Sequence, residues 1–271
     1  MKARGGPGIA VIVSTYERPD ALDAVLRSLA EQTYRAFEVV VADDGSGPDT
    51  RELVAGHAKT SGLDLRHVRQ EDRGYRLAAI RNRAAAATGQ PYLIFLDGDC
   101  LVRPDYVERH AGLAEPGHFV HGSRVRLDPG LSRTAIEQGP GIERRGAIRW
   151  LAEWLRGRAD RFTPLLRVPL GPLRRMTPRR WHGVKGCNLA LWRSDFLAVN
   201  GFDEGFEGWG FEDNDLVVRL IRNGVRRKEG RYAVPVLHLW HKSRPPDPAS
   251  RERFERRLRS DTIRAERGID G

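Results

Sequence analysis

The chain has 271 residues, of which 40% are apolar and 30% charged, as in ordinary globular proteins. No apolar run approaches the roughly 18 residues that a membrane-spanning helix needs, and two cysteines, Cys100 and Cys187, are too few for a disulfide framework. The formal charge of +10 suggests polyanions, anionic lipid surfaces or phosphorylated ligands as partners.

Strands and helices alternate through the first hundred residues. Strands are predicted at 9–13, 37–42, 63–68 and 92–97, and helices at 19–31, 51–60 and 77–87. This order predicts an α/β fold, a mostly parallel Rossmann-like sheet with flanking helices in a single domain. The apolar stretch 9–13 is too short for a secretory signal, so a cytoplasmic location is expected, behind a flexible terminus at 1–8.

Acidic residues follow two of the predicted strands. Asp97-Gly98-Asp99 ends the apolar run that begins at Tyr92. Asp43-Asp44 follows the predicted strand at 37–42. Two carboxylates flanking a glycine can hold a hard cation such as Mg²⁺ or Mn²⁺, and this edge of an open α/β sheet is where ligands bind. The alternative is a surface turn, because Asp-Gly is common in turns. No dinucleotide-binding or P-loop glycine motif occurs, which disfavours those two classes.

The middle of the chain is strongly basic. After a predicted helix at 104–113 and a predicted strand at 119–127, we expect an arm or insertion at 128–182, in which residues 142–182 carry eleven Arg against three acids. A helix predicted at 147–158 is amphipathic and includes Trp150 and Trp154. It is either an interfacial helix or mobile acceptor arm, or an ordinary helix packed on the core.

A second acidic centre follows a strand predicted at 186–192. Glu212, Asp213 and Asp215 lie at the start of a helix predicted at 213–223, where the helix dipole favours negative charge. A strand at 234–237 then leads to His238 and His241, by themselves a weak metal signal. The last thirty residues, 242–271, are predicted to be a tail with a surface helix at 249–267.

Six motifs together resemble a GT-A glycosyltransferase over residues 9–245. They are Val-Ser-Thr-Tyr-Glu-Arg-Pro (13–19), Ala-Asp-Asp-Gly-Ser (42–46), Arg81-Asn82, Leu-Asp-Gly-Asp (96–99), Gly-Phe-Asp-Glu (201–204) and Gly-Trp-Gly-Phe-Glu-Asp-Asn-Asp (208–215). The first half resembles family 2 of inverting enzymes. The second half resembles the galactosyltransferase-type region of β-1,4-galactosyltransferases and bacterial chondroitin polymerases.

The resemblance implies a UDP-sugar donor, a Mn²⁺ or Mg²⁺ cofactor and inversion at the anomeric carbon. It assigns nucleotide-sugar binding to Thr15, Tyr16, Arg18, Asp43 or Asp44 at the uracil ring, Arg81 near the diphosphate, Asp97 and Gly98. It assigns metal ligation to Asp99 and His241, and with less weight to His238.

For the acceptor, a glycan or a lipid-linked glycan, the resemblance implies three roles. Trp209 would stack on a sugar, Glu212 would bind acceptor hydroxyls and Asp213 would be the catalytic base. Phe211 departs from the Gly often found at this place in the motif, which bears on the shape of the acceptor pocket.

Two other functions remain as alternatives. A nucleotidyltransferase also uses acids on an α/β sheet, but normally has a Gly-rich amino-terminal phosphate loop that this sequence lacks. The net charge and the basic arm could instead mark a non-catalytic binder of nucleic acid or of an anionic membrane on a GT-A scaffold. The intact acidic motifs argue against this second class, and we expect no nucleic-acid partner.

Overall fold

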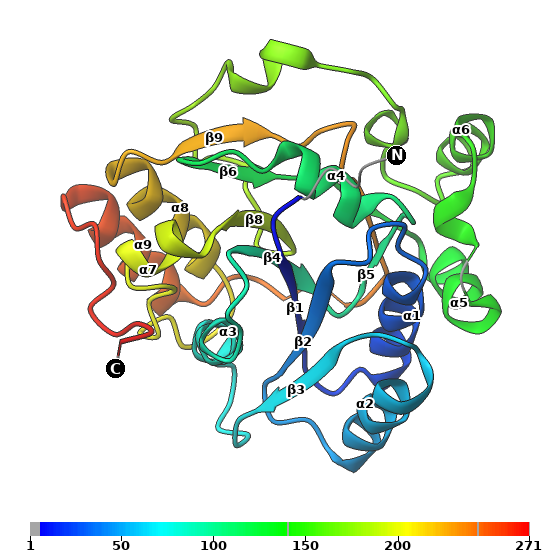
Figure 1. Ribbon diagram of the computed structural model, residues 1–271, viewed down its shortest axis with the longest axis horizontal. Helices are drawn as coiled ribbons and strands as arrows, with labels where there is room; N and C mark the ends of the chain where they lie inside the picture. Colours follow the sequence, from blue (N-terminus) through cyan, green and yellow to red (C-terminus); the bar gives the residue numbers. More distant parts are fainter. Residues whose placement is uncertain (1–5, 140, 243, 271) are drawn as a thin grey trace.

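A mixed seven-stranded sheet runs through the middle of the computed structural model, which describes residues 6–139, 141–242 and 244–270 (Figure 1). Across the sheet the strands are β3 (Leu65–Arg69), β2 (Phe37–Asp43), β1 (Ile9–Thr15), β4 (Tyr92–Asp97), β8 (Asn188–Trp192), β6 (His118–His121) and β9 (Arg226–Glu229). The first four are parallel, whereas β8 is antiparallel to both of its neighbours. The predicted α/β fold with a mostly parallel sheet is confirmed.

Both faces of the sheet are covered, which explains why its central strands are apolar throughout. Ile9, Val11 and Val13 of β1 pack in the core beneath α1 (Pro19–Ala30). Alternate residues of the same strand, such as Ile12, pack in a second core with α3 (Leu77–Ala86). Because side chains of a strand alternate between faces, a strand buried on both sides needs an uninterrupted apolar run.

The remaining helices lie around the sheet, as Figure 1 shows. They are α2 (Pro48–Thr60), α4 (Tyr106–Leu113), α5 (Pro129–Gln138), α6 (Ala147–Leu155), α7 (Arg193–Ala198), α8 (Glu212–Arg222) and α9 (Pro248–Arg259). Short 3₁₀ helices lie at Ile142–Arg144, Thr163–Leu165 and Gly171–Arg175. Sequence reasoning missed α5, α7 and β9; β9 reads Arg-Arg-Lys-Glu, a charged edge strand without an apolar pattern.

The predicted single strand at 119–127 is wrong, because the chain changes sheets within it. A second sheet has the order β5 (Cys100–Val102), β10 (Val236–His238) and β7 (Arg124–Arg126), so β6 and β7 belong to different sheets. At the break, a Cβ on Gly122 would collide with the Asn188 side chain and the Val234 carbonyl. This close approach requires glycine.

The strand order reverses between β1 and β4, a position at which open α/β sheets bind ligands in a crevice at the carboxyl ends of the strands. From β1 the chain moves outward through β2 and β3, then returns to place β4 on the other side of β1. Adjacent strands whose connections leave in opposite directions open such a crevice in α/β sheets. Asp97 and Asp99 are brought to this edge.

The predicted tail packs more closely on the rest of the chain than expected. Its helix α9 ends at Arg259 rather than 267, and it buries Phe254 and Arg257. Arg257 bonds Asp215 of α8 at 2.7 Å and Asp203 at 2.8 Å, so the expected surface helix is tied to the second acidic centre.

At the other end of the chain, Pro7 accepts a hydrogen bond from the Tyr34 hydroxyl, while residues 1–5 of the terminus predicted to be flexible lie outside the described residues. Among the described helices, none combines the length and the apolar character needed to cross a bilayer.

Candidate active site

Asp43 and Asp44 end β2, and hydrogen bonds from within the chain hold both carboxylates. Asp43 accepts from the Ser46 amide at 2.8 Å and contacts the His67 ring and the Arg69 guanidinium at 3.0 and 3.1 Å. Burial by itself would raise its pKa, but the bonds from His67 and Ser46 lower the pKa of Asp43 to about 2. Asp43 is thus a fixed anion that organises the turn after β2.

Asp44 has fewer partners. It accepts from the Gln70 side chain and from the Arg76 amide, the latter at 2.9 Å, and burial raises the pKa of its carboxyl group. Asp44 is therefore the more available of the two acids for a nucleotide base, and its contact with uracil stays a prediction.

The loop after β1 carries three of the predicted nucleotide residues. Thr15 is buried, and its hydroxyl has no hydrogen-bond partner among the described residues. Tyr16 is about half exposed and donates to Asp72 at 3.2 Å, while Arg18 bonds Asp20 at 2.9 Å. An unpaired buried hydroxyl is costly unless a ligand completes it, so Thr15 fits a donor site.

Gly98 joins the β1 end to the acids after β4. Its amide donates to the Ser14 carbonyl at 2.7 Å, and a Cβ at this position would lie 2.8 Å from the same oxygen. Only glycine permits that approach without a backbone shift. The glycine of the Asp-Gly-Asp motif therefore sets the distance between the nucleotide loop and the carboxylates.

Asp99 lies beside both histidines of the later motif. Its Oδ2 is 3.6 Å from Nε2 of His238 and 3.4 Å from Nε2 of His241. Burial lowers the pKa of His238, which keeps its ring neutral and able to bind a metal. The Cys100 thiol lies close to Asp99 and His238, although burial raises its pKa well above the usual range. A carboxylate with two imidazoles is a donor set suited to Mn²⁺ and suits Mg²⁺ less well, since that ion prefers oxygen ligands.

The second acidic centre is at the amino-terminal end of α8. Asp213 accepts hydrogen bonds from the Gly186 and Asn214 amides, each at 2.7 Å, so both of its oxygens are held by backbone. Glu212 is buried, and its Oε2 has no partner among the described residues. Burial and the neighbouring Asp213 raise the pKa of Glu212 to about 7. Adjacent carboxyl groups with such different surroundings are typical of catalytic sites.

The unusual Phe211 occupies a left-handed backbone conformation with φ of 72°. Glycine adopts this conformation without strain, whereas other residues pay roughly 1–2 kcal/mol. The Phe211 ring stacks on Phe254 of α9 with centroids 5.2 Å apart, and Arg251 lies over its face. Contact with the tail thus compensates for a strained residue next to Glu212.

Trp209 lies in the same loop and is exposed by 43%, which leaves its indole available to a ligand. Its carbonyl accepts from the Asp247 amide at 2.9 Å, so the tail also holds this part of the loop.

Arg81 connects the two acidic centres. This guanidinium is fully buried and bonds Asp97 at 2.7 Å, Glu212 at 3.4 Å and the Ser14 hydroxyl at 3.0 Å. Asp97 and Glu212 are far apart in sequence but share this one cation. The predicted approach of Arg81 to a diphosphate is not tested by these contacts and stays a prediction.

Sequence reasoning missed two residues that shape this region. The Tyr75 carbonyl accepts a hydrogen bond from the Gly208 amide at 3.0 Å. Burial, and next to it the charge of Glu212, raise the pKa of the Tyr75 hydroxyl. The Gly186 amide holds Asp213, and only the position of this glycine before a strand could have drawn attention to it. Asn82 of the Arg81-Asn82 motif donates to the Phe202 carbonyl and accepts from the Phe202 amide, each at 2.9 Å.

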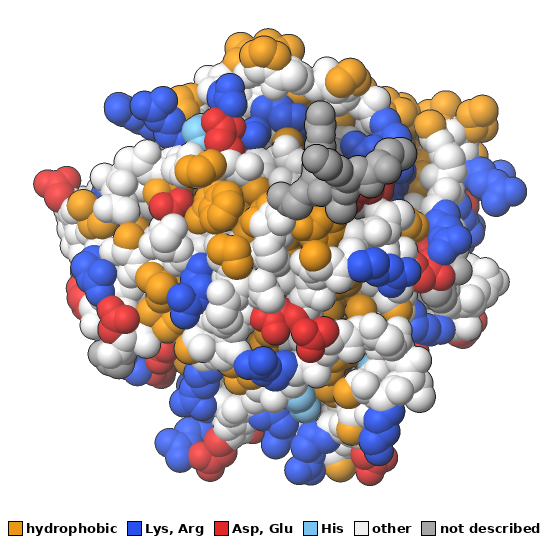
Figure 2. Space-filling model, viewed as in Figure 1, with side chains coloured by type: hydrophobic (Ala, Val, Ile, Leu, Met, Phe, Trp, Pro, Cys, Tyr) orange, Lys and Arg blue, Asp and Glu red, His pale blue; other side chains and the backbone are white. Residues whose placement is uncertain are grey.

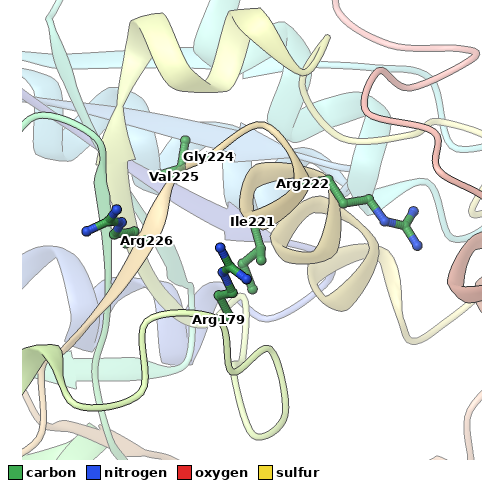
Figure 3. A pocket seen from close by; sticks show the side chains of 6 residues that line it. All are labelled: Arg179, Ile221, Arg222, Gly224, Val225 and Arg226. Carbon is green, nitrogen blue, oxygen red and sulfur yellow. The ribbon is translucent and has the colours of Figure 1, made fainter.

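A separate hollow of about 400 Å³ lies where α8 ends and β9 begins (Figure 3). It is lined by Arg179, Ile221, Arg222, Gly224, Val225 and Arg226, and Figure 3 shows the Arg222 side chain directed away from the others. Arg222 bonds carbonyls of the tail instead. With no carboxylate in its lining, this hollow does not belong to the acidic site.

Two family profiles match the chain along most of its length. "Glycosyl transferase family 2" matches residues 10–170, and "N-terminal domain of galactosyltransferase" matches residues 175–242. Validoxylamine A glucosyltransferase of Streptomyces hygroscopicus subsp. jinggangensis is 37% identical over 81% of this chain and 52% of its own. Chondroitin synthase of Escherichia coli is 30% identical over 83% of this chain and 34% of its own. The chain thus spans about half or less of these relatives.

Solved structures share the fold. The mannosyltransferase PcManGT of Pyrobaculum calidifontis, in complex with GDP-Man and Mn²⁺, has a TM-score of 0.62 at 20% identity and covers 88% of this chain and 59% of its own. S. aureus TarS 1-349 in complex with UDP has a TM-score of 0.64 at 16% identity, covering 97% and 67%. The likeness confirms the expected GT-A fold.

Proposed function

The chain belongs to glycosyl transferase family 2, and from this premise we propose that it transfers a hexose or N-acetylhexosamine from a UDP-sugar to a hydroxyl group of a glycan or lipid-linked acceptor, with inversion at the anomeric carbon. The contacts of Arg81 carry the proposal. One buried guanidinium bonds Asp97 on the donor side and Glu212 on the acceptor side, so the two acidic centres form a single site.

The donor half would bind the nucleotide diphosphate. Asp99, His238 and His241 would hold Mn²⁺ or Mg²⁺, which acts as a Lewis acid on the departing diphosphate when it is bound. The Thr15 hydroxyl, which has no partner among the described residues, would bond the nucleotide, and Arg81 would hold the Asp97 carboxylate in place for ribose or sugar hydroxyls.

The acceptor half would supply the base. Asp213 takes the proton of the acceptor hydroxyl, whose oxygen forms a bond to the anomeric carbon while the bond to the diphosphate oxygen breaks on the opposite face. Two backbone amides fix the orientation of Asp213, and each of its oxygens keeps a free lone pair for the proton. The Oε2 of Glu212, which has no partner among the described residues, would bind the acceptor, and the exposed Trp209 of the preceding loop would stack on a sugar ring.

The names of the similar proteins guide the choice of donors to be tested. One relative is a glucosyltransferase, and the similar structures include complexes with UDP, UDP-GlcNAc and GDP-Man. Release of nucleotide diphosphate should therefore be measured with UDP-glucose, UDP-GlcNAc and GDP-mannose in the presence of Mn²⁺. Turnover with none of these donors, across a panel of sugar acceptors, would contradict the proposal.

The assignment of the base has its own test. Asp213→Asn keeps the size and removes basicity, and it keeps one of the two backbone hydrogen bonds because its NH₂ group cannot accept the other. Transfer should fall by about 100-fold or more while the affinity for UDP stays nearly constant. Glu212→Gln is the matched control, and a larger loss of turnover in that variant would exchange the two roles. NMR of the product shows whether the anomeric configuration inverts.

A further inference from the structure

The apolar face of α6 points away from the protein. Ile148 and Leu155 are 85% and 70% exposed, and Leu151 and Trp154 are also exposed, whereas Trp150 and Glu153 are buried. On a helix with 3.6 residues per turn, Ile148 and Leu155 lie opposite the buried pair. Core packing of this face, one of the two expectations from sequence, is therefore wrong. An outward apolar stripe of this kind needs a partner to cover it.

The surroundings of this stripe are cationic. All three acids of residues 142–182 are already engaged: Glu143 accepts from Gly141, Glu153 pairs with Arg145, and Asp160 pairs with Arg126. Arg149 and Arg156 flank the stripe on one side, and neither forms an ion pair with a described residue. Figure 2 shows hydrophobic side chains projecting at the upper right, where Figure 1 places α6, with basic side chains beside them.

A cavity of about 530 Å³ opens at the amino-terminal end of the same helix. Its lining includes four arginines, Arg103, Arg144, Arg145 and Arg167, with Gly146 and the two carboxylates of Asp105 and Glu143. Three of these arginines have carboxylate partners, but the Arg103 guanidinium has none among the described residues although the residue is only 9% exposed. Burial and the nearby Arg167 lower the pKa of Arg103, and the charge of Asp105 offsets this only in part. A buried cation without a counter-ion beside helix amides is suited to an anion such as phosphate.

We propose that α6 and this cavity form a docking site for an anionic phospholipid bilayer. The Ile148 and Leu155 face enters the boundary between headgroups and acyl chains, Arg149 and Arg156 lie among anionic headgroups, and the Arg103 cavity accepts a headgroup phosphate. A second copy of this chain fits less well, because a two-fold contact would bring these uncompensated arginines together.

The site is joined to the three-stranded sheet, whose central strand β10 ends at His238. Leu127 donates its amide to the His238 carbonyl at 3.0 Å and pairs with Ala159, just beyond α6. Docking of α6 would therefore place the His238 strand near the lipid surface. The proposal does not rest on the proposed function, since lipid binding requires neither donor nor metal.

Flotation with vesicles tests it on the full chain. The protein should bind vesicles of phosphatidylcholine mixed with phosphatidylglycerol at low salt, and release them at high salt. Ile148→Ser/Leu155→Ser should weaken binding on the order of 100-fold, and Arg149→Gln/Arg156→Gln about 30-fold at low salt. Because these side chains are exposed, the variants should keep the wild-type fold. Leu258→Ser/Ile263→Ser, at exposed positions of the tail, is the matched control and should bind like wild type.

The cavity is tested separately by Arg103→Met, which should lower affinity for the anionic vesicles about 5-fold. Absence of vesicle binding by the wild type at low salt would overturn the proposal. So would a dimer in analytical ultracentrifugation that Ile148→Ser/Leu155→Ser dissociates while vesicle binding is unchanged. Thermal protection by inorganic phosphate that Arg103→Met abolishes, without vesicle binding, would likewise show that the cavity takes free phosphate rather than lipid.

Discussion

Replacing Glu212 by Gln removes a carboxyl group whose surroundings oppose its ionisation. Burial, with Asp213 beside it, raises the pKa of Glu212 from 4.5 to about 7. Between these values the folded chain holds a proton that the unfolded chain has released, so the free energy of unfolding falls as pH rises from about 4.5 to about 7 and this contribution is constant outside that window. At about 1.4 kcal/mol for each pKa unit, the group should lower stability by about 3 kcal/mol across the window.

Urea unfolding of the wild type and of Glu212→Gln at a series of pH values measures this contribution. Gln has nearly the same size and cannot ionise, so the free-energy difference between the two proteins should shift in favour of the variant by about 3 kcal/mol between pH 4.5 and pH 7. Glu252→Gln changes an exposed carboxylate of α9 and should keep the wild-type pH dependence. Parallel curves for the wild type and Glu212→Gln would refute the argument that burial holds the proton on Glu212.

Three further predictions concern the donor site and the tail. Asp99→Ala should abolish Mn²⁺-dependent binding of UDP in calorimetry while the circular dichroism spectrum stays unchanged; wild-type affinity would remove Asp99 from the metal site. Gly98→Ala places a Cβ against the Ser14 carbonyl, and the resulting backbone shift should lower turnover about 100-fold in a transfer assay; unchanged turnover would show that the loop adjusts without cost. Phe254→Ala removes a buried ring stacked on Phe211 and should lower the free energy of unfolding by about 3–5 kcal/mol, measured in urea, whereas a change below 1 kcal/mol would show that the tail does not stabilise this loop.

Local patterns in the sequence determined most of the fold. The apolar runs that become β1, β2 and β4, and the periodic stripe of α1, are visible without any structure because each buries its apolar side chains through a regular repeat. The acids at the strand ends and at the start of α8 were likewise recognisable, since they stand out in fixed order against apolar neighbours.

Long-range contacts could not be obtained in this way. The bridge of Arg81 between Asp97 and Glu212 joins residues up to 131 positions apart, and nothing in the local sequence of Arg81 names its partners. The division of the predicted strand 119–127 depends on how closely Gly122 approaches Asn188 and Val234. Strand pairing and steric contacts of this kind exist only once the chain has folded.

The helix α6 shows the same limit most directly. Periodicity revealed that Ile148, Leu151 and Leu155 share one face, which follows from the 3.6-residue repeat alone. It left open whether that face meets the core or the solvent, because an amphipathic pattern has the same period in either orientation. Tertiary packing decided the question: Trp150 and Glu153 are the residues that α6 buries, and the apolar face is left on the outside.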